Sequence, residues 1–118
     1  MTTDDLPELR LRPGLLDTVR YAAAMWEFQL LHFDHERARA EGLERSIVQG
    51  PLLGTYLVRL LGGAGPLEHL EWRNHAVVPV DTDLVCGGTL DRGTGEARLW
   101  IRDGAGTTVV SGSALVRP

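Results

Sequence analysis

The chain has 118 residues, a length typical of one domain with a modest core, and a formal net charge of −4. This charge argues against nucleic acid as a partner, because phosphate binding needs a basic surface. Cys86 is the single cysteine, so no internal disulfide can form and no structural zinc site is expected. The acidic start lacks the features of a signal peptide, and the apolar stretch 51–61 is too short to span a bilayer; we expect a cytoplasmic protein.

The first part of the chain carries weak and mixed signals. Residues 1–5 are expected to be frayed, and residues 6–12 alternate weakly between apolar and polar side chains. Pro13-Gly14 indicates a turn. The segment 15–21 is compatible with a strand, whereas the alanine-rich 22–25 favours a helical turn.

Two helices are predicted next. The charged run 35–41 predicts a short solvated helix, with Asp34 as its N-cap and Gly42 just past its end. A second helix opens at Pro51, which suits a first helical position because its missing N–H costs nothing there, and stops at Gly62-Gly63. This helix is apolar nearly all round, which is typical of a buried helix.

The remainder predicts antiparallel strands. The expected elements are a long strand over 70–80, a strand over 84–90, a loop at 91–95, a strand over 97–101, a hairpin turn at 103–106 and a final strand over 109–116. A buried helix followed by a four-stranded meander predicts an α+β fold with the helix on the sheet. Cys86 is expected in the core, and His69 and His75 on a sheet face.

Three stretches within roughly residues 15–91 resemble the MaoC-like family of (R)-specific enoyl-thioester hydratases and dehydratases. The family pattern Asp-x-Asn-Pro-x-His-x-Asp corresponds to Glu27–Asp34, where the Phe-Gln-x-x-His spelling is similar to small single-hotdog hydratases of steroid side-chain breakdown. Its His-Gly step into a long helix corresponds to Gln49-Gly50. Its Pro-x-x-x-Gly-Asp-x-Leu pattern is similar to residues 76–84. We read Gln49 as structural.

The resemblance implies a set of site residues. His32 falls on the catalytic histidine, and Glu27 replaces the family's aspartate as the second acid–base group; which of the two is the acid stays open. The N–H of Gly50, at a helix start, is implied to face the thioester oxygen. Gln29 and Asp34 are implied as supporting residues, and no metal or redox cofactor is implied.

The resemblance also implies a fold and an activity. The fold is the hotdog, a long buried helix wrapped by a curved antiparallel sheet, here as one domain over 1–118 that forms a homodimer or pairs with another hotdog subunit. The activity is addition of water to a 2-enoyl-CoA, in fatty acid or steroid metabolism. Arg73 is a candidate contact for a CoA phosphate, because arginine suits phosphates.

Three alternatives stay open, in part because Glu27 is one methylene longer than the family's aspartate. They are an acyl-carrier-protein dehydratase, a non-catalytic hotdog subunit of a heteromeric hydratase, and a thioesterase. Fold alone does not separate these functions.

Overall fold

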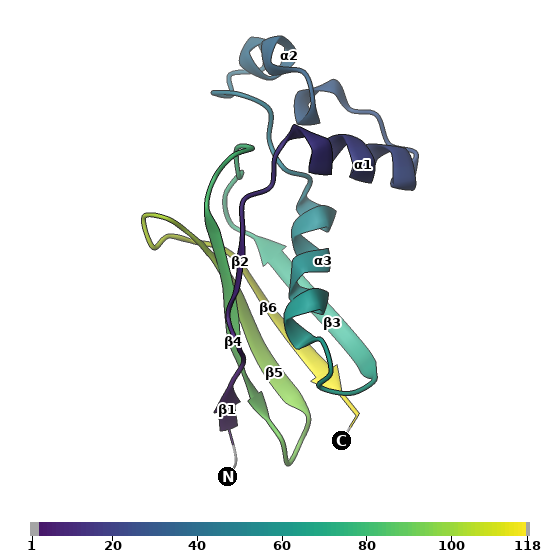
Figure 1. Cartoon of the computed structure of the whole chain (residues 1–118), viewed down its shortest axis with the longest axis vertical. Helices are drawn as coiled ribbons and strands as arrows, with labels where there is room; N and C mark the ends of the chain where they lie inside the picture. The colour runs from purple at the N-terminus through teal and green to yellow at the C-terminus, as the bar shows by residue number, and fades with distance from the viewer. Residues whose placement is uncertain (1–2, 118) are drawn as a thin grey trace.

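The computed structural model describes residues 3–117, which form a six-stranded antiparallel sheet curved around one helix (Figure 1). No helix within these residues combines the length and apolarity needed to cross a membrane. In chain order the elements are β1 (Thr3–Asp5), β2 (Leu9–Leu11), α1 (Leu15–Met25), the 3-10 turn η1 (Leu30–His32), α2 (His35–Ala40), α3 (Gly50–Leu61), β3 (Leu67–Asn74), β4 (Leu84–Asp91), β5 (Glu96–Asp103) and β6 (Thr108–Val116).

Helix α3 is the buried helix that the sequence predicts. It begins at Gly50, has Pro51 in its first turn, and is followed by Gly62 at its C-cap. Leu53 and Leu57 are almost completely buried, and they pack in one apolar cluster with residues of the sheet. The sheet contributes Leu84, Cys86, Leu90, Leu99, Ile101 and Val110 to this cluster, among others. Burial of this face against the sheet supplies the main driving force for folding.

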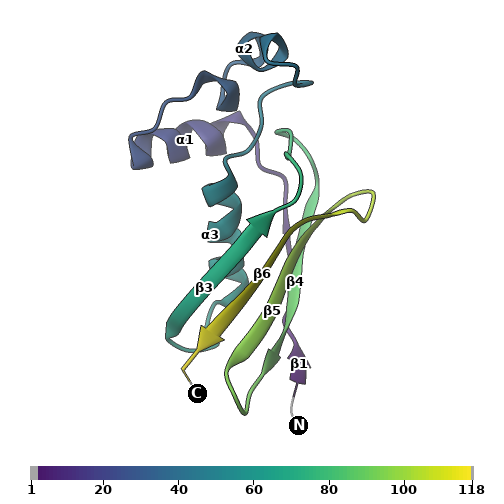
Figure 2. The ribbon, with the colours of Figure 1, turned by 180° about the vertical axis from the view of Figure 1, so that it is seen from behind.

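The order of the strands corrects the predicted four-stranded meander. β4, β5 and β6 follow one another as predicted, but β3 pairs with β6, so the sheet reads β1-β4-β5-β6-β3, and β2 also pairs with β4. β3 is therefore an edge strand, and the connection from β3 to β4 passes across the sheet. Figure 2 shows β3, β6, β5 and β4 side by side, with α3 behind them.

The long strand expected over 70–80 is wrong in its second half, because β3 ends at Asn74. The next apolar residues leave β6 and pair with the segment before α3. Val48 N donates to Val78 O at 2.8 Å, and Val80 N donates to Ser46 O at 2.9 Å. The apolar alternation is real, but the strand changes its partner partway along.

The N-terminal region departs from expectation in two places. Residues 3–5 form β1, which pairs with β4, so they are not frayed; residues 1–2 lie outside the described part. The segment 15–21, compatible with a strand by sequence, is helical and belongs to α1. Gly14 N donates to Asp17 Oδ2 at 2.8 Å, an interaction that closes the first turn of this helix.

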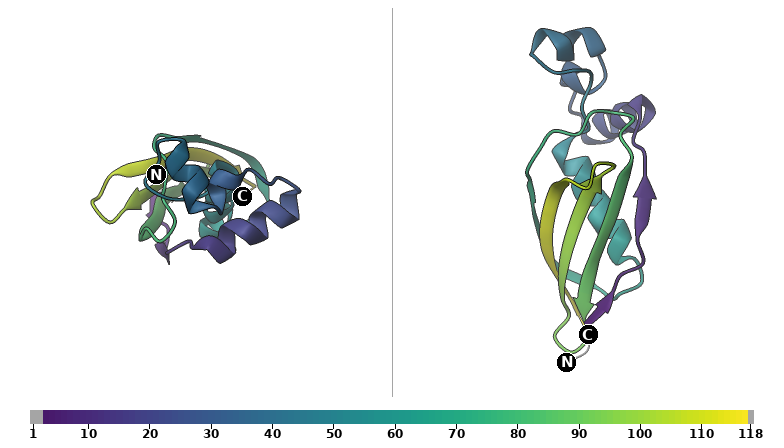
Figure 3. Two further views of the ribbon diagram at one scale, coloured as in Figure 1. Left: turned by 90° about the horizontal axis from the view of Figure 1, so that it is seen from above. Right: turned by 90° about the vertical axis from the view of Figure 1, so that its left-hand side faces the viewer.

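Residues 14–49, which we call the cap segment, contain α1, η1 and α2. They lie beyond one end of the sheet and over the start of α3, as the views in Figure 3 show. The molecule is therefore elongated, with principal extents of 50 × 31 × 19 Å. The cap segment places η1 close to the first turn of α3.

Candidate functional site

A pocket of about 330 Å³ lies where the cap segment meets α3 and the end of β3. Its lining includes His32 from η1, Gly50 and Leu53 from α3, Asn74 at the end of β3, and His75, which follows β3. Three larger hollows, of about 630, 490 and 390 Å³, lie over the sheet strands, and none of them is lined by His32 or Gly50. The pocket at the start of α3 therefore unites a buried imidazole with a helix N-terminus.

His32 is held in one orientation by the backbone. Its side chain is buried, and Nδ1–H donates to Ile47 O at 2.8 Å. A carbonyl oxygen can only accept a hydrogen bond, so Nδ1 carries the proton of the neutral ring and Nε2 is left unprotonated. Ile47 N in turn donates to Leu31 O at 3.2 Å. The ring is thus prepared to accept a proton at Nε2.

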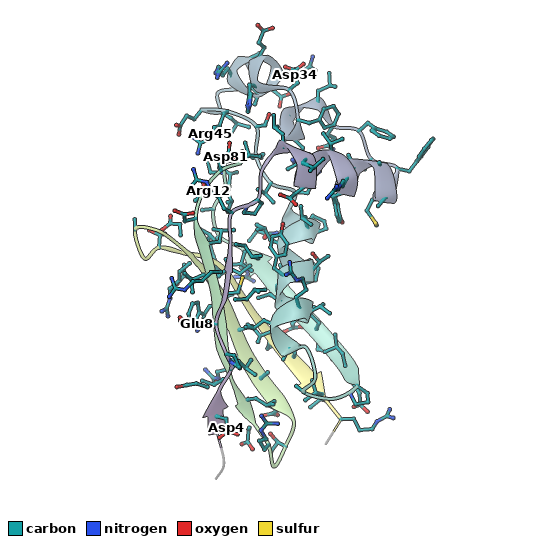
Figure 4. All side chains as sticks on the ribbon, viewed as in Figure 1. Asp4, Glu8, Arg12, Asp34, Arg45 and Asp81 are labelled. Carbon is teal, nitrogen blue, oxygen red and sulfur yellow. The ribbon has the colours of Figure 1, made fainter. Side chains whose placement is uncertain are left out.

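Asp34 holds the turn that carries His32 but does not enter the pocket. Its side chain accepts a hydrogen bond from Arg37 N at 3.1 Å, which confirms it as the N-cap of α2. Its backbone N–H donates to Leu30 O at 2.7 Å. Figure 4 shows Asp34 at the start of α2, in the cap segment. These two hydrogen bonds close the turn at η1 and cap the start of α2.

The N-terminus of α3 has free donors. No side chain caps this helix, and the first turn contains Pro51, which has no N–H. The N-cap residue Gln49 is buried and faces elsewhere: its Nε2 donates to Thr18 O in α1 at 2.9 Å. This contact confirms the structural role expected of Gln49. Gly50, the first residue of α3, lines the pocket.

Asn74 and His75 were not predicted as site residues. His69 is exposed and hydrogen-bonds Glu71 on β3, as expected of a residue on a sheet face. His75 instead lines the pocket, with its Nε2 in a 2.6 Å hydrogen bond with Ser111 Oγ. Sequence alone could not predict that either residue lines the pocket, because both reach it only through the pairing of β3 with β6.

Glu27 and Gln29 do not line this pocket. Glu27 is exposed and follows Trp26, the C-cap of α1, which has a left-handed backbone conformation with φ of 55°. Burial, and to a smaller extent the nearby carboxylate of Glu27, raise the pKa of Tyr21. Gln29 is exposed at the N-cap of η1 and makes no capping hydrogen bond through its side chain. The pocket thus brings together His32 and Gly50, and neither Glu27 nor Gln29 lines it.

Arg73 lies beside a different hollow. This hollow, of about 490 Å³, is lined by residues of β3 and β6 that include Glu71, Arg73, Ser111 and Ser113. Successive side chains of a strand point to opposite faces, so Arg73 and Asn74 face opposite sides of β3. Within residues 3–117, no group of three or more His, Cys, Asp or Glu side chains is arranged to bind a metal.

No protein-family model and no curated protein matches the sequence. Solved structures do match. The (R)-hydratase from A. caviae involved in PHA biosynthesis is 22% identical with a TM-score of 0.89, covering 100% of this chain and 97% of that one. A chain of the ChsH1-ChsH2 complex from Mycobacterium tuberculosis is 21% identical with a TM-score of 0.85, covering 99% and 98%. A MaoC-like dehydratase is 23% identical with a TM-score of 0.86, covering 99% of this chain and 40% of that one. The chain therefore has the hotdog fold of these proteins, as the resemblance implies.

Proposed function

We propose that the protein is a hydratase/dehydratase of the MaoC-like type that acts on 2-enoyl and 3-hydroxyacyl thioesters, with CoA as the carrier. The observation that carries the proposal is the pocket lined both by a buried His32, whose Nδ1 is bonded to the backbone, and by the uncapped start of α3. The neighbours in fold support it, because they include an (R)-hydratase and a MaoC-like dehydratase.

In the hydration direction, Nε2 of His32 takes a proton from water and the water oxygen bonds to C3. The electron pair of the C2=C3 bond moves to the thioester, whose oxygen becomes enolate-like. The N–H of Gly50 donates to this oxygen, with the positive end of the α3 dipole behind it. The electron pair then returns to C2, which takes one proton either from protonated His32 or from a protonated Glu27 that afterwards regains a proton from His32. The addition is complete without a metal or redox step.

Glu27 is the second proposed acid–base group, and its observed position means that it has to move for catalysis. In the isolated chain its carboxylate is exposed and outside the pocket. It would have to turn toward His32 when substrate binds, within about 2.6–3.2 Å of the reacting proton or of one intervening water. Gln29, two residues further on, is proposed to support that turn.

Substrate and partner binding are proposed around β3. This edge strand has free backbone groups along one side, which are a liability in an isolated sheet. A second hotdog chain, identical or different, is proposed to cover it. Arg73, exposed on this strand, is proposed to bind a CoA phosphate, a role that suits its planar charged group.

A second candidate function is a non-catalytic subunit of a heteromeric hydratase. The position of Glu27 outside the pocket favours it, and one neighbour in fold is a two-component complex. In this case the chain alone is inactive, and activity appears only with the partner chain.

The test is loss of absorbance of crotonyl-CoA, and of bulkier enoyl-CoAs, with the purified protein alone and with any co-encoded hotdog chain. His32→Gln keeps a donor for Ile47 O but removes the base, so the rate should fall about 10²–10⁴-fold. His69→Ala, at an exposed histidine, is the matched control and should keep the wild-type rate. A normal rate for His32→Gln would remove His32 from the mechanism.

Two variants at position 27 separate the enzyme from the accessory subunit. In an enzyme, Glu27→Gln removes the proton-transfer group and Glu27→Asp shortens it, so both lower the rate. In an accessory subunit, Glu27→Gln leaves the activity of the complex unchanged, and Glu27→Asp can only raise activity from near zero. An enzyme whose rate is unchanged in both variants does not use Glu27.

A further inference from the structure

Asn74 is a polar side chain of the pocket to which the proposed mechanism gives no role. It is the last residue of β3 and lines the pocket together with His32 and Gly50. The hydrogen bonds formed among residues 3–117 include none to its side-chain amide, although the neighbouring His75 is bonded to Ser111. Asn74 is also an exposed residue, so its amide is open to solvent and to a group that enters the pocket.

The start of α3 is shaped to receive this amide. A Cβ atom at Gly50 would lie 2.6 Å from Asn74 Nδ2, too close for any real contact. One turn further along the helix, a Cβ at Gly54 would lie 2.5 Å from the ring of Trp72. Gly50 and Gly54, four positions apart on α3, thus leave room for two side chains of β3. These are Asn74 and Trp72, which lie two positions apart on the strand. The match of these spacings presses the Asn74 amide against the first turn of α3.

We propose that Asn74 binds the thioester carbonyl oxygen together with the backbone N–H of Gly50. This inference rests on the proposed function, since it assigns the second donor of the same site. Asn74 can supply N–H donors to an oxygen that becomes negative as the C2=C3 electron pair shifts toward it. An amide is uncharged and takes no part in proton transfer. It therefore stabilises the enolate without disturbing the proton exchange at His32.

The chemistry fixes the order in which substitutions should act. Asn74→Ala removes the donor, and the loss of one oxyanion donor costs about 10²-fold or more in kcat. Asn74→Asp keeps the shape but replaces the donor by a carboxylate that repels the developing charge, so it should be slower still. A role in packing alone predicts the opposite order, because Asp fills the same space as Asn and Ala does not.

The first experiment measures kcat and KM for crotonyl-CoA in wild type, Asn74→Ala, Asn74→Asp and the control His69→Ala on the same strand. The expected result is a fall in kcat with KM changed much less, in the order wild type, Ala, Asp. Light scattering and circular dichroism establish that assembly and fold are kept. A wild-type kcat in Asn74→Ala, or a faster Asp than Ala variant, would overturn the role of Asn74 while leaving the hydratase intact.

The second experiment does not require turnover. Infrared difference spectra of butyryl-CoA carrying ¹³C at the thioester carbon report hydrogen bonding to its oxygen. We expect a downshift of the carbonyl stretch on binding to wild type that is largely lost in Asn74→Ala. If wild type hydrates no enoyl-CoA but shows this shift, the proposed activity fails and the Asn74 contact stands. If butyryl-CoA does not bind, or binds with equal stretch in both proteins, the contact is refuted.

Discussion

The contact between Gly54 and Trp72 allows a specific prediction about Gly54→Ala. The added methyl group should clash with the indole but should also favour the helix, and these two effects can be separated. In Gly54→Ala the new Cβ would lie 2.5, 2.7 and 2.8 Å from three atoms of the Trp72 indole. Overpacking of this kind costs about 1–3 kcal/mol. Alanine is favoured over glycine inside a helix by about 1 kcal/mol, which offsets part of that cost. The net expectation is a loss of up to about 2 kcal/mol.

The sign should reverse when the indole is absent. In a Trp72→Ala background the methyl group meets no ring, so Gly54→Ala should stabilise the protein by about 0.5–1 kcal/mol through helix propensity alone. The two substitutions are then coupled by about 2 kcal/mol, which a double-mutant cycle measures directly.

The assay is thermal and urea unfolding followed by circular dichroism in the four proteins of the cycle. For a chain of 118 residues, 1 kcal/mol corresponds to a shift in Tm of about 4 °C. Gly104→Ala is the control, because no atom lies within 4 Å of its added Cβ, and it should change stability by less than about 0.5 kcal/mol. If Gly54→Ala changes stability with the same sign in both backgrounds, the fit of helix to strand is not what requires glycine at position 54.

Three further predictions follow from burial and from the sheet edge. Leu57→Asp places an unpaired charge on the fully buried face of α3, which costs several kcal/mol, so the variant should be insoluble; normal melting would contradict the burial. Burial raises the pKa of Cys86 to about 11 and the pKa of Tyr56 to about 12. As the pH rises, the unfolded chain therefore loses these two protons before the folded chain does. The free energy of unfolding should fall as the pH rises from about 9 to 12. Urea titrations should show a shallower fall in a Tyr56→Phe/Cys86→Ala variant. Light scattering should detect a dimer held by β3, and a stable, active monomer at micromolar concentration would refute this.

The buried helix could be predicted from sequence because every local signal agrees there. Gly50-Pro51 opens α3, the residues that follow are almost all apolar, and Gly62 stops it. Helix α1 gave no such agreement, because its hydrophobic pattern is inverted. Thr18 and Ala22 face the interior, whereas Leu16 and Val19 are exposed. Prediction from hydrophobic periodicity assumes that large apolar residues are buried. This assumption fails in α1, so the helix could not be predicted in this way.

The site could be predicted only in the parts that are local in sequence. His32 and Gly50 were expected together, from a resemblance, and the pocket does contain both. Asn74 was missed because nothing near it in sequence indicates α3. The usable signal was the paired spacing of Gly50 and Gly54 against Trp72 and Asn74, which has meaning only once helix and strand are known to touch.

The place of β3 in the sheet has a consequence for how the protein is made. β3 leaves the ribosome before β4, β5 and β6, yet its partner is β6, with Leu67 opposite Val116. Until β6 is synthesised, β3 has no strand to bond to and the apolar side of α3 lacks part of its cover. The nascent chain therefore carries its buried helix partly uncovered while residues 62–116 are synthesised. Chaperones that bind exposed apolar segments should engage the growing chain over this interval and release it when β6 docks.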